Sequence, residues 1–122
     1  MAEGPRRVLI VDDERSVCEL LEQFFSPRGF SVTSAFSGEE ALARLKEEPV
    51  DVVLIDILLP GIHGIEVLKQ AKQRYPKARV AMITALEDKD LRTRAHTYGA
   101  DAYVTKPFNF SDPIWAELTA TA

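Results

Sequence analysis

The stretch Val8-Leu9-Ile10-Val11-Asp12-Asp13-Glu14 places four apolar residues directly before three acidic ones. A short apolar run that is rich in β-branched residues and closed by carboxylates predicts a buried strand with polar groups at its carboxyl end. Four more apolar runs follow along the chain. The five predicted strands cover residues 7–12, 30–35, 51–56, 79–84 and 102–105.

Segments with helical spacing lie between and after these strands. In the first segment, apolar residues recur every three or four positions and predict one inward-facing stripe of Val17, Leu20, Leu21, Phe24 and Phe25. Further helices are predicted after Ser37-Gly38, before Pro76, over residues 87–98 and from Ser111 onward. The segment 87–98 has few apolar residues, so we expect that helix to pack weakly.

Strands and helices alternate five times, and the strands are apolar on both faces. This order predicts an α/β fold with a five-stranded, doubly wound parallel sheet and helices on both faces. The 122 residues suffice for a single domain, with a core over about residues 7–118. Since about one helix follows the fifth strand, we expect no output domain in this chain.

The composition argues against several classes of protein. No apolar run exceeds four residues, far short of the roughly 18 that a membrane-spanning helix needs, so we expect no membrane contact and a cytoplasmic location. The formal net charge of −4 disfavours direct binding to nucleic acid. Cys18 is the single cysteine, which excludes an internal disulfide and predicts a small buried residue.

Polar residues follow four of the predicted strands: Asp12, Asp13, Asp56, Thr84 and Lys106. The carboxyl ends of parallel strands share one sheet edge, and ligands bind where the strand order reverses. Each aspartate taken alone is as readily explained as a turn residue or a helix cap as by a role in a binding site. Three carboxylates in one crevice repel by on the order of 1 to 4 kcal/mol per pair at about 4 Å. The lysine and a divalent cation with oxygen ligands, most plausibly Mg²⁺, would compensate this repulsion.

A cation, a lysine and a hydroxyl group beside carboxylates are groups that stabilise a transferring phosphoryl group. The sequence has no glycine-rich G-x-x-x-x-G-K-[ST] loop, which argues against binding of a free nucleotide. One of the carboxylates is then the expected phosphoryl acceptor, because a carboxylate can act as a nucleophile and form an aspartyl phosphate.

Four short motifs occur in order along the chain. They are Val8 to Glu14, the segment Asp56-Ile57-Leu58-Leu59-Pro60-Gly61-Ile62-His63-Gly64, the pair Thr84-Ala85, and Ala102-Tyr103-Val104-Thr105-Lys106-Pro107-Phe108. In order and spacing they resemble the receiver domain of two-component response regulators, over about residues 7–115. The resemblance implies a flavodoxin-like, CheY-like fold. It also implies a phosphoacceptor switch, which is not a turnover enzyme.

By this resemblance, Asp56 accepts a phosphoryl group from a sensor histidine kinase or a phosphotransfer protein. Asp13, Asp56 and the backbone carbonyl of Leu58 would ligate Mg²⁺ (or Mn²⁺), and Asp12 would act largely through bound water. Lys106 would pair with the phosphoryl oxygens.

The resemblance also implies how the switch works. Thr84 would hydrogen-bond the phosphoryl group, and Tyr103 would turn inward as Thr84 moves. The Lys106–Pro107 bond is expected to be cis. The fourth helix, fifth strand and fifth helix would form the output surface. A homodimer formed on phosphorylation is a further expectation, and no residue specifies the downstream effector.

Leu58 and Leu86 depart from the family pattern, in which the positions two residues after Asp56 and Thr84 are frequently polar. A polar side chain there can orient an attacking water, whereas leucines hinder it. We therefore hypothesise a long-lived aspartyl phosphate.

Two other interpretations compete with this one. Haloacid-dehalogenase-like phosphatases also use an aspartate nucleophile, but it begins a D-x-D pattern, and Asp56-Ile57-Leu58 lacks the second aspartate. A pseudo-receiver would bind partners without phosphorylation, and the joint presence of all five polar residues disfavours it.

Three other side chains carry competing interpretations. Trp115 and Tyr98 are equally compatible with a partner surface and with ordinary packing. His63 is expected to be a solvated loop residue, because magnesium prefers oxygen ligands.

Overall fold

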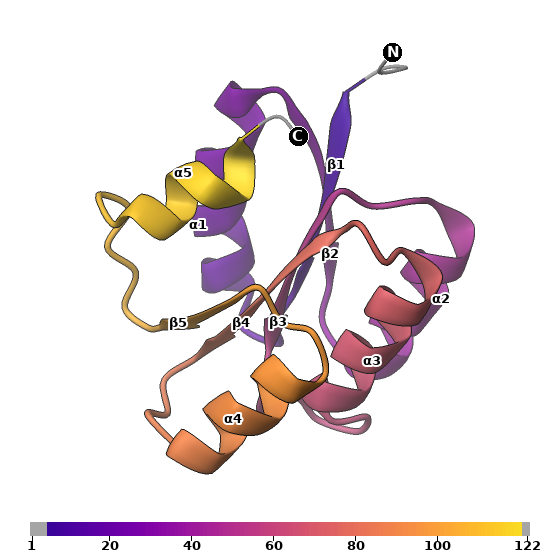
Figure 1. The fold of residues 1–122 in the computed structure, drawn as a ribbon. Coiled ribbons are helices and arrows are strands. Elements are labelled where there is room, and N and C mark those ends of the chain that lie inside the picture. Colours follow the sequence, from indigo (N-terminus) through magenta and orange to yellow (C-terminus); the bar gives the residue numbers. More distant parts are fainter. Residues whose placement is uncertain (1–4, 121–122) are drawn as a thin grey trace.

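The computed structural model describes residues 5–120, in which five strands alternate with five helices (Figure 1). The elements are β1 (Arg6–Val11), α1 (Arg15–Phe25), the 3₁₀ turn η1 (Ser26–Arg28), β2 (Phe30–Ala35), α2 (Gly38–Glu47), β3 (Val52–Asp56), α3 (Gly64–Arg74), β4 (Arg79–Thr84), α4 (Lys89–Thr97), β5 (Ala102–Thr105) and α5 (Pro113–Thr119).

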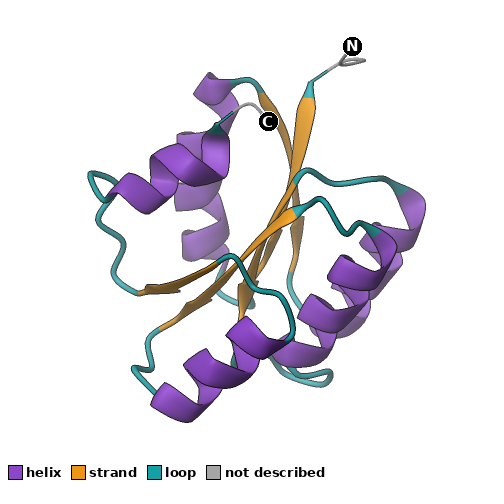
Figure 2. Cartoon of the chain, viewed as in Figure 1, coloured by secondary structure: helices purple, strands orange, loops and turns teal. Residues whose placement is uncertain are grey.

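All five strands are parallel and lie in the order β2-β1-β3-β4-β5. Helices α1 and α5 cover one face of the sheet, and α2, α3 and α4 cover the other (Figures 1 and 2). The predicted doubly wound α/β fold is confirmed. The strand order reverses between β1 and β3, so the loops after these two strands flank the crevice that such sheets use for ligands.

The sheet is buried on both faces, as near-continuous apolar strands require. All five residues of β3 are buried, and each face of the sheet has its own apolar cluster. Trp115 belongs to the cluster under α1 and α5, where its ring packs against Phe24, Phe108 and Phe110. Its exposed fraction is 1%, so of its two interpretations the packing role is correct.

One residue of the predicted α1 stripe is wrong. Leu20 is 44% exposed, and the buried face of α1 consists of Cys18, Leu21, Phe24 and Phe25. Successive helical residues are separated by roughly 100°, and the buried face is centred between Leu21 and Phe25. Leu20 therefore lies at the flank of this face, while Cys18 lies within it and is buried as expected.

Several element boundaries differ from the prediction by one or two residues. Strand β1 ends before Asp12, whose side chain forms a turn with Glu14 N–H. Helix α4 begins two residues later than predicted, after the cap Asp88, and α5 begins at Pro113, after the cap Asp112. Local side-chain hydrogen bonds to free N–H groups set these boundaries.

Helix α4 is the helix with the least support from the core. Ala95 is its single fully buried residue, whereas α3 buries five. The expected weak packing of this helix is confirmed. Within residues 5–120, no helix has the length and apolar character to cross a membrane.

Candidate functional site

Three aspartates meet at the carboxyl ends of β1 and β3. One carboxylate oxygen each of Asp12, Asp13 and Asp56 lies within 4.8 Å of the others. Asp12 and Asp56 are buried, whereas Asp13 is exposed. Thr84 ends the neighbouring strand β4 and is also buried, one residue beyond Ile83, which lies opposite Asp56. The sheet topology therefore brings together residues that are far apart in the sequence.

Three of these side chains also form the turn that follows their strand. The N–H groups of Glu14, Leu58 and Leu86 donate to the side-chain oxygens of Asp12, Asp56 and Thr84, at 2.9, 3.0 and 3.1 Å. Such turns satisfy a free N–H and fix the side-chain rotamer. In both aspartates the bonded atom is Oδ1, so Oδ2 remains available for the site.

Lys106 joins these free oxygens. Its Nζ lies 2.7 Å from Asp12 Oδ2, 3.3 Å from Asp56 Oδ2 and 3.3 Å from Glu14 Oε1. The Lys106 N–H donates to the carbonyl of Thr84 at 2.7 Å, and the Lys106–Pro107 peptide bond is cis. The backbone of Lys106 is thus fixed to the end of β4, and its ammonium lies between the carboxylates.

Burial and charge act in opposite directions at this site. Burial raises the pKa of Asp56, and the hydrogen bond from Leu58 N–H and the charge of Lys106 counteract part of this shift. For Lys106, burial lowers the pKa, but hydrogen bonds and charges from Asp12 and Asp56 outweigh burial and raise it. The ammonium therefore stays protonated, and Asp56 is a more basic carboxylate than an exposed aspartate.

The donor set fits a hard divalent cation. The ammonium of Lys106 contacts the carboxylates of Asp12, Glu14 and Asp56, and Asp13 adds a fourth carboxylate beside Asp12 and Asp56, which leaves an excess of negative charge. Opposite oxygen ligands of Mg²⁺ lie about 4.1 Å apart. The three aspartate oxygens lie within 4.8 Å of one another, close to this span.

The sequence interpretation missed the contact between Glu14 and Lys106. The signal was present, because Glu14 is the third acidic residue in the run after β1. Its side chain is 61% exposed, so it lies at the solvent side of the lysine. Its charge adds to the negative potential that attracts a cation.

Two leucines border the site, and Tyr103 lies apart from it. Leu58 and Leu86 are 52% and 42% exposed, at the first turns after Asp56 and Thr84. The Tyr103 hydroxyl donates to the carbonyl of Leu86 at 3.0 Å rather than to any acidic residue. His63 is exposed as expected, and in addition its Nδ1 caps α3 by accepting from Ile65 N–H at 3.1 Å.

Comparison with known proteins gives one consistent family. Residues 8–115 match the model of the response regulator receiver domain. The chain is 38% identical over 104 residues to the alkaline phosphatase synthesis transcriptional regulatory protein PhoP of Bacillus subtilis, covering 85% of this chain and 43% of PhoP. It therefore spans less than half the length of this relative.

Solved structures agree with the family match. A CheY-like receiver domain protein from Methanospirillum hungatei superposes with a TM-score of 0.86 and 31% identity, covering 93% of this chain and 91% of the other. Response regulator TrrA from Thermotoga maritima, solved in complex with Mg²⁺ and beryllium fluoride, gives a TM-score of 0.79 and 34% identity over 93% and 96% of the chains. The chain therefore belongs to the response regulator receiver domain family, whose members are generally signalling switches.

Proposed function

We propose that this chain is a phosphoacceptor switch in which Asp56 takes a phosphoryl group from a sensor histidine kinase or a phosphotransfer protein. The observation that carries this proposal is the position of Lys106, whose Nζ lies within 3.3 Å of both Asp12 Oδ2 and Asp56 Oδ2. A fixed ammonium beside a basic, partly desolvated carboxylate suits the transfer of a group with charged peripheral oxygens.

Asp13, Asp56 and the backbone carbonyl of Leu58 would hold Mg²⁺ (or Mn²⁺), with Asp12 acting through bound water. When bound, the cation would neutralise charge on the phosphoryl oxygens. Exposed Asp13 and half-exposed Leu58 lie on the solvent side of the site, where a cation can enter.

The chemistry of the acceptor requires one bond to form and one to break. A carboxylate oxygen of Asp56 would form a bond to phosphorus as the phosphorus–nitrogen bond to the donor histidine breaks, and the imidazole nitrogen would keep the electron pair. Lys106 would then exchange its contact with Asp56 Oδ2 for a phosphoryl oxygen. The buried Thr84 hydroxyl, one strand away, would provide a second donor.

The same step would set the output surface. Phosphorylation would add about one negative charge to the one that the Asp56 carboxylate already carries, together with new acceptor oxygens. These would draw Thr84 and Lys106 toward Asp56, and with them the loops after β4 and β5. Tyr103 would turn inward as Thr84 moves. Helix α4 lies between these loops and is weakly packed, so the face made by α4, β5 and α5 would be remodelled for a downstream partner or for a second copy of the chain.

Intact-protein mass spectrometry after incubation with acetyl phosphate and Mg²⁺ tests the proposal. We expect one added phosphoryl group in the wild type and in the control Asp90→Asn, an exposed aspartate on α4, but none in Asp56→Asn. An unlabelled wild type would favour a pseudo-receiver. Sustained hydrolysis of a phosphomonoester would instead favour a phosphatase.

A further inference from the structure

Strand β5 has one edge that faces no other strand. It is the last strand in the sheet order and pairs with β4 alone. Directly after it, Lys106 N–H donates to the carbonyl of Thr84 on β4, whereas the preceding carbonyl, that of Ile83, accepts a hydrogen bond from the β3 side. Main-chain groups alternate between the two sides of a strand. The even-numbered residues of β5 therefore direct their N–H and C=O groups toward β4, and Tyr103 and Thr105 direct theirs away from it.

The outward main-chain groups have no protein partner among the described residues. No turn, loop or cap hydrogen bond within residues 5–120 involves the main-chain N–H or C=O of Tyr103 or Thr105. All four residues of β5 are half-buried, so no element covers the strand completely. Such an edge can accept the backbone of another extended chain.

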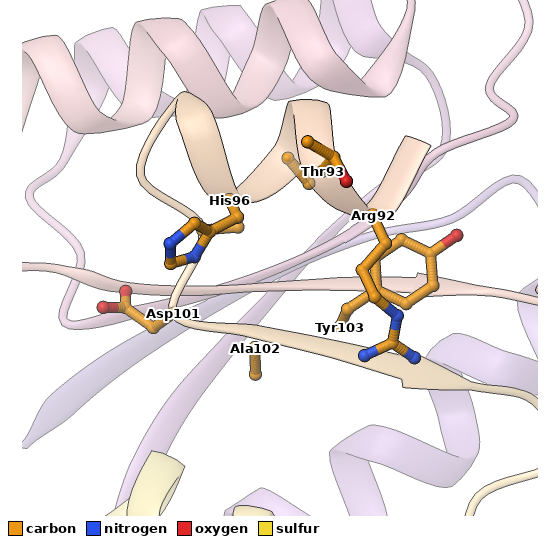
Figure 3. A pocket seen from close by; sticks show the side chains of 8 residues that line it. Arg92, Thr93, His96, Asp101, Ala102 and Tyr103 are labelled. Atoms are coloured by element: carbon orange, nitrogen blue, oxygen red, sulfur yellow. The ribbon is translucent and has the colours of Figure 1, made fainter. Parts of the chain in front are cut away.

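Two hollows flank this edge, one on each face of the sheet. The first, of about 420 Å³, lies between α4 and β5, with Thr93 and His96 on one side and Asp101 and Ala102 on the other (Figure 3). The second, of about 470 Å³, lies on the α5 side, where Ile114 lines it. Successive side chains of a strand point to opposite faces, so those of an added strand would enter the two hollows in turn.

The hollows favour a separate extended segment over the same strand of a second copy. In a second copy, the side chain of Tyr103 packs against the apolar cluster under α2, α3 and α4, and those of Ala102 and Val104 pack against the cluster under α1 and α5. These side chains are therefore not free to fill the hollows. A flexible peptide has unpacked side chains on both faces of its backbone.

The lining of the hollows indicates the chemistry of the side chains that fit. Ala95 and Ala100 give the α4-side hollow an apolar lining. Arg92 lines both hollows, and its guanidinium carbon lies 4.6 Å from the ring centroid of Tyr103. The ion pair of Arg92 with Glu87 joins side chains that are 51% and 66% exposed. Exposed pairs of this kind contribute little to stability, so a carboxylate of a bound peptide can replace Glu87 at small cost.

We propose that the free edge of β5 binds an extended peptide segment of a partner protein, which adds a strand to the sheet. The segment places an apolar side chain in the α4-side hollow and an acidic side chain beside Arg92. The proposal rests on the proposed function, which makes this face the output surface, and it identifies the kind of partner. Main-chain hydrogen bonds to Tyr103 and Thr105 provide affinity, and the two hollows provide specificity.

A displayed library of random heptapeptides, screened against the unphosphorylated protein, supplies the probe. Fluorescence polarisation then measures the affinity of a selected peptide and of two forms that are N-methylated at alternate residues. Each form lacks the N–H donors along one edge of the extended peptide. We expect one form to bind about tenfold or more weakly and the other to bind as the parent peptide does, because only one edge of the peptide faces β5.

Two further measurements locate the bound peptide. Amide hydrogen exchange at Tyr103 and Thr105 should slow when the peptide binds, because their N–H groups gain an acceptor. Thr93→Phe should weaken binding by filling the α4-side hollow. Thr97→Phe is the matched control, since Thr97 is exposed on the same helix and lines neither hollow. Circular dichroism checks that both variants fold.

The proposal is overturned if the two N-methylated forms bind equally well, if exchange at Tyr103 and Thr105 is unchanged by the peptide, or if the library gives no binder with a Kd below about 1 mM. A dimer seen by sedimentation and abolished by Thr93→Phe would overturn it in favour of a second copy. All these measurements use the unphosphorylated protein. A wild type that acetyl phosphate does not label would therefore refute the proposed function and leave the outcome of these measurements intact.

Discussion

Replacing Asp13 by asparagine should stabilise the protein in the absence of metal. One Asp13 carboxylate oxygen lies within 4.8 Å of oxygens of both Asp12 and Asp56. The three ion pairs of Lys106 go to Asp12, Glu14 and Asp56, so Asp13 has no close positive partner among the described residues. Its charge therefore contributes repulsion without local compensation.

The size of the effect follows from the distance. Two like charges 4.8 Å apart repel by about 0.9 kcal/mol in water, and because Asp13 is exposed the dielectric constant of water applies. Two such neighbours cost about 2 kcal/mol. Attraction to Lys106 at longer range offsets part of this, which leaves a stabilisation of roughly 1 kcal/mol for Asp13→Asn, or about 3 to 5 °C in Tm.

Urea unfolding at neutral pH in EDTA, followed by the fluorescence of the single tryptophan Trp115, measures this change. Glu19→Gln, an exposed acid on α1, is the control for loss of one negative charge elsewhere. Saturating Mg²⁺ should raise the stability of the wild type by mass action, about 2.7 kcal/mol at 100 times the Kd, and should raise that of Asp13→Asn far less. The reasoning is refuted if Asp13→Asn unfolds at lower urea in EDTA, or if Mg²⁺ stabilises it as fully as the wild type.

Three further predictions follow from the same geometry. Leu58→Asn combined with Leu86→Glu should shorten the lifetime of the aspartyl phosphate, because polar groups at these exposed positions can orient a water; phosphate release measures this, and equal rates would contradict it. Burial raises the pKa of Asp56 above its ordinary value of 3.8, so just above that pH the native state still holds a proton that the unfolded chain has lost. As the pH rises further, the metal-free wild type should therefore lose stability relative to Asp56→Asn. Urea unfolding of both proteins across this pH range measures the trend. A free energy of unfolding that rises with pH in the wild type relative to Asp56→Asn would contradict the prediction. Gly64→Ala should destabilise by about 1 to 3 kcal/mol, because the new Cβ would collide with the backbone of Asp56 and Ile57; an unchanged urea midpoint would show that the loop yields freely.

The strands and the site residues at their ends were predictable because the signals are local. An apolar run closed by a carboxylate, as at Val11-Asp12, gives both the strand and the edge at which the polar group appears. Topology then places Asp56 and Lys106 at that edge without any knowledge of their contacts. The buried face of α1 was less certain, since Leu20 lies at the flank of the apolar stripe and only packing decides that it stays exposed.

The contacts of long side chains were not predictable in this way. Lys106 bonds to Glu14 across 92 residues, and the rotamers of both chains decide the contact. Arg92 is one of several charged residues in α4, and no sequence pattern distinguishes it from Arg94. Its position over Tyr103 depends on the packing angle between α4 and β5, which is a property of the whole fold.

The interpretation of a strand-end aspartate as a turn residue is correct for Asp12 and Asp56, and in each the second oxygen contacts Lys106. Oδ1 accepts the N–H two residues ahead and forms the turn, whereas Oδ2 contacts Lys106. An asparagine keeps an oxygen for the turn and removes the charge, whereas an alanine removes both. Asp56→Ala should therefore lose about 0.5 to 1.5 kcal/mol relative to Asp56→Asn through the unpaired N–H of Leu58, although neither variant can be phosphorylated at this position. Equal unfolding free energies would show that the turn does not depend on this oxygen.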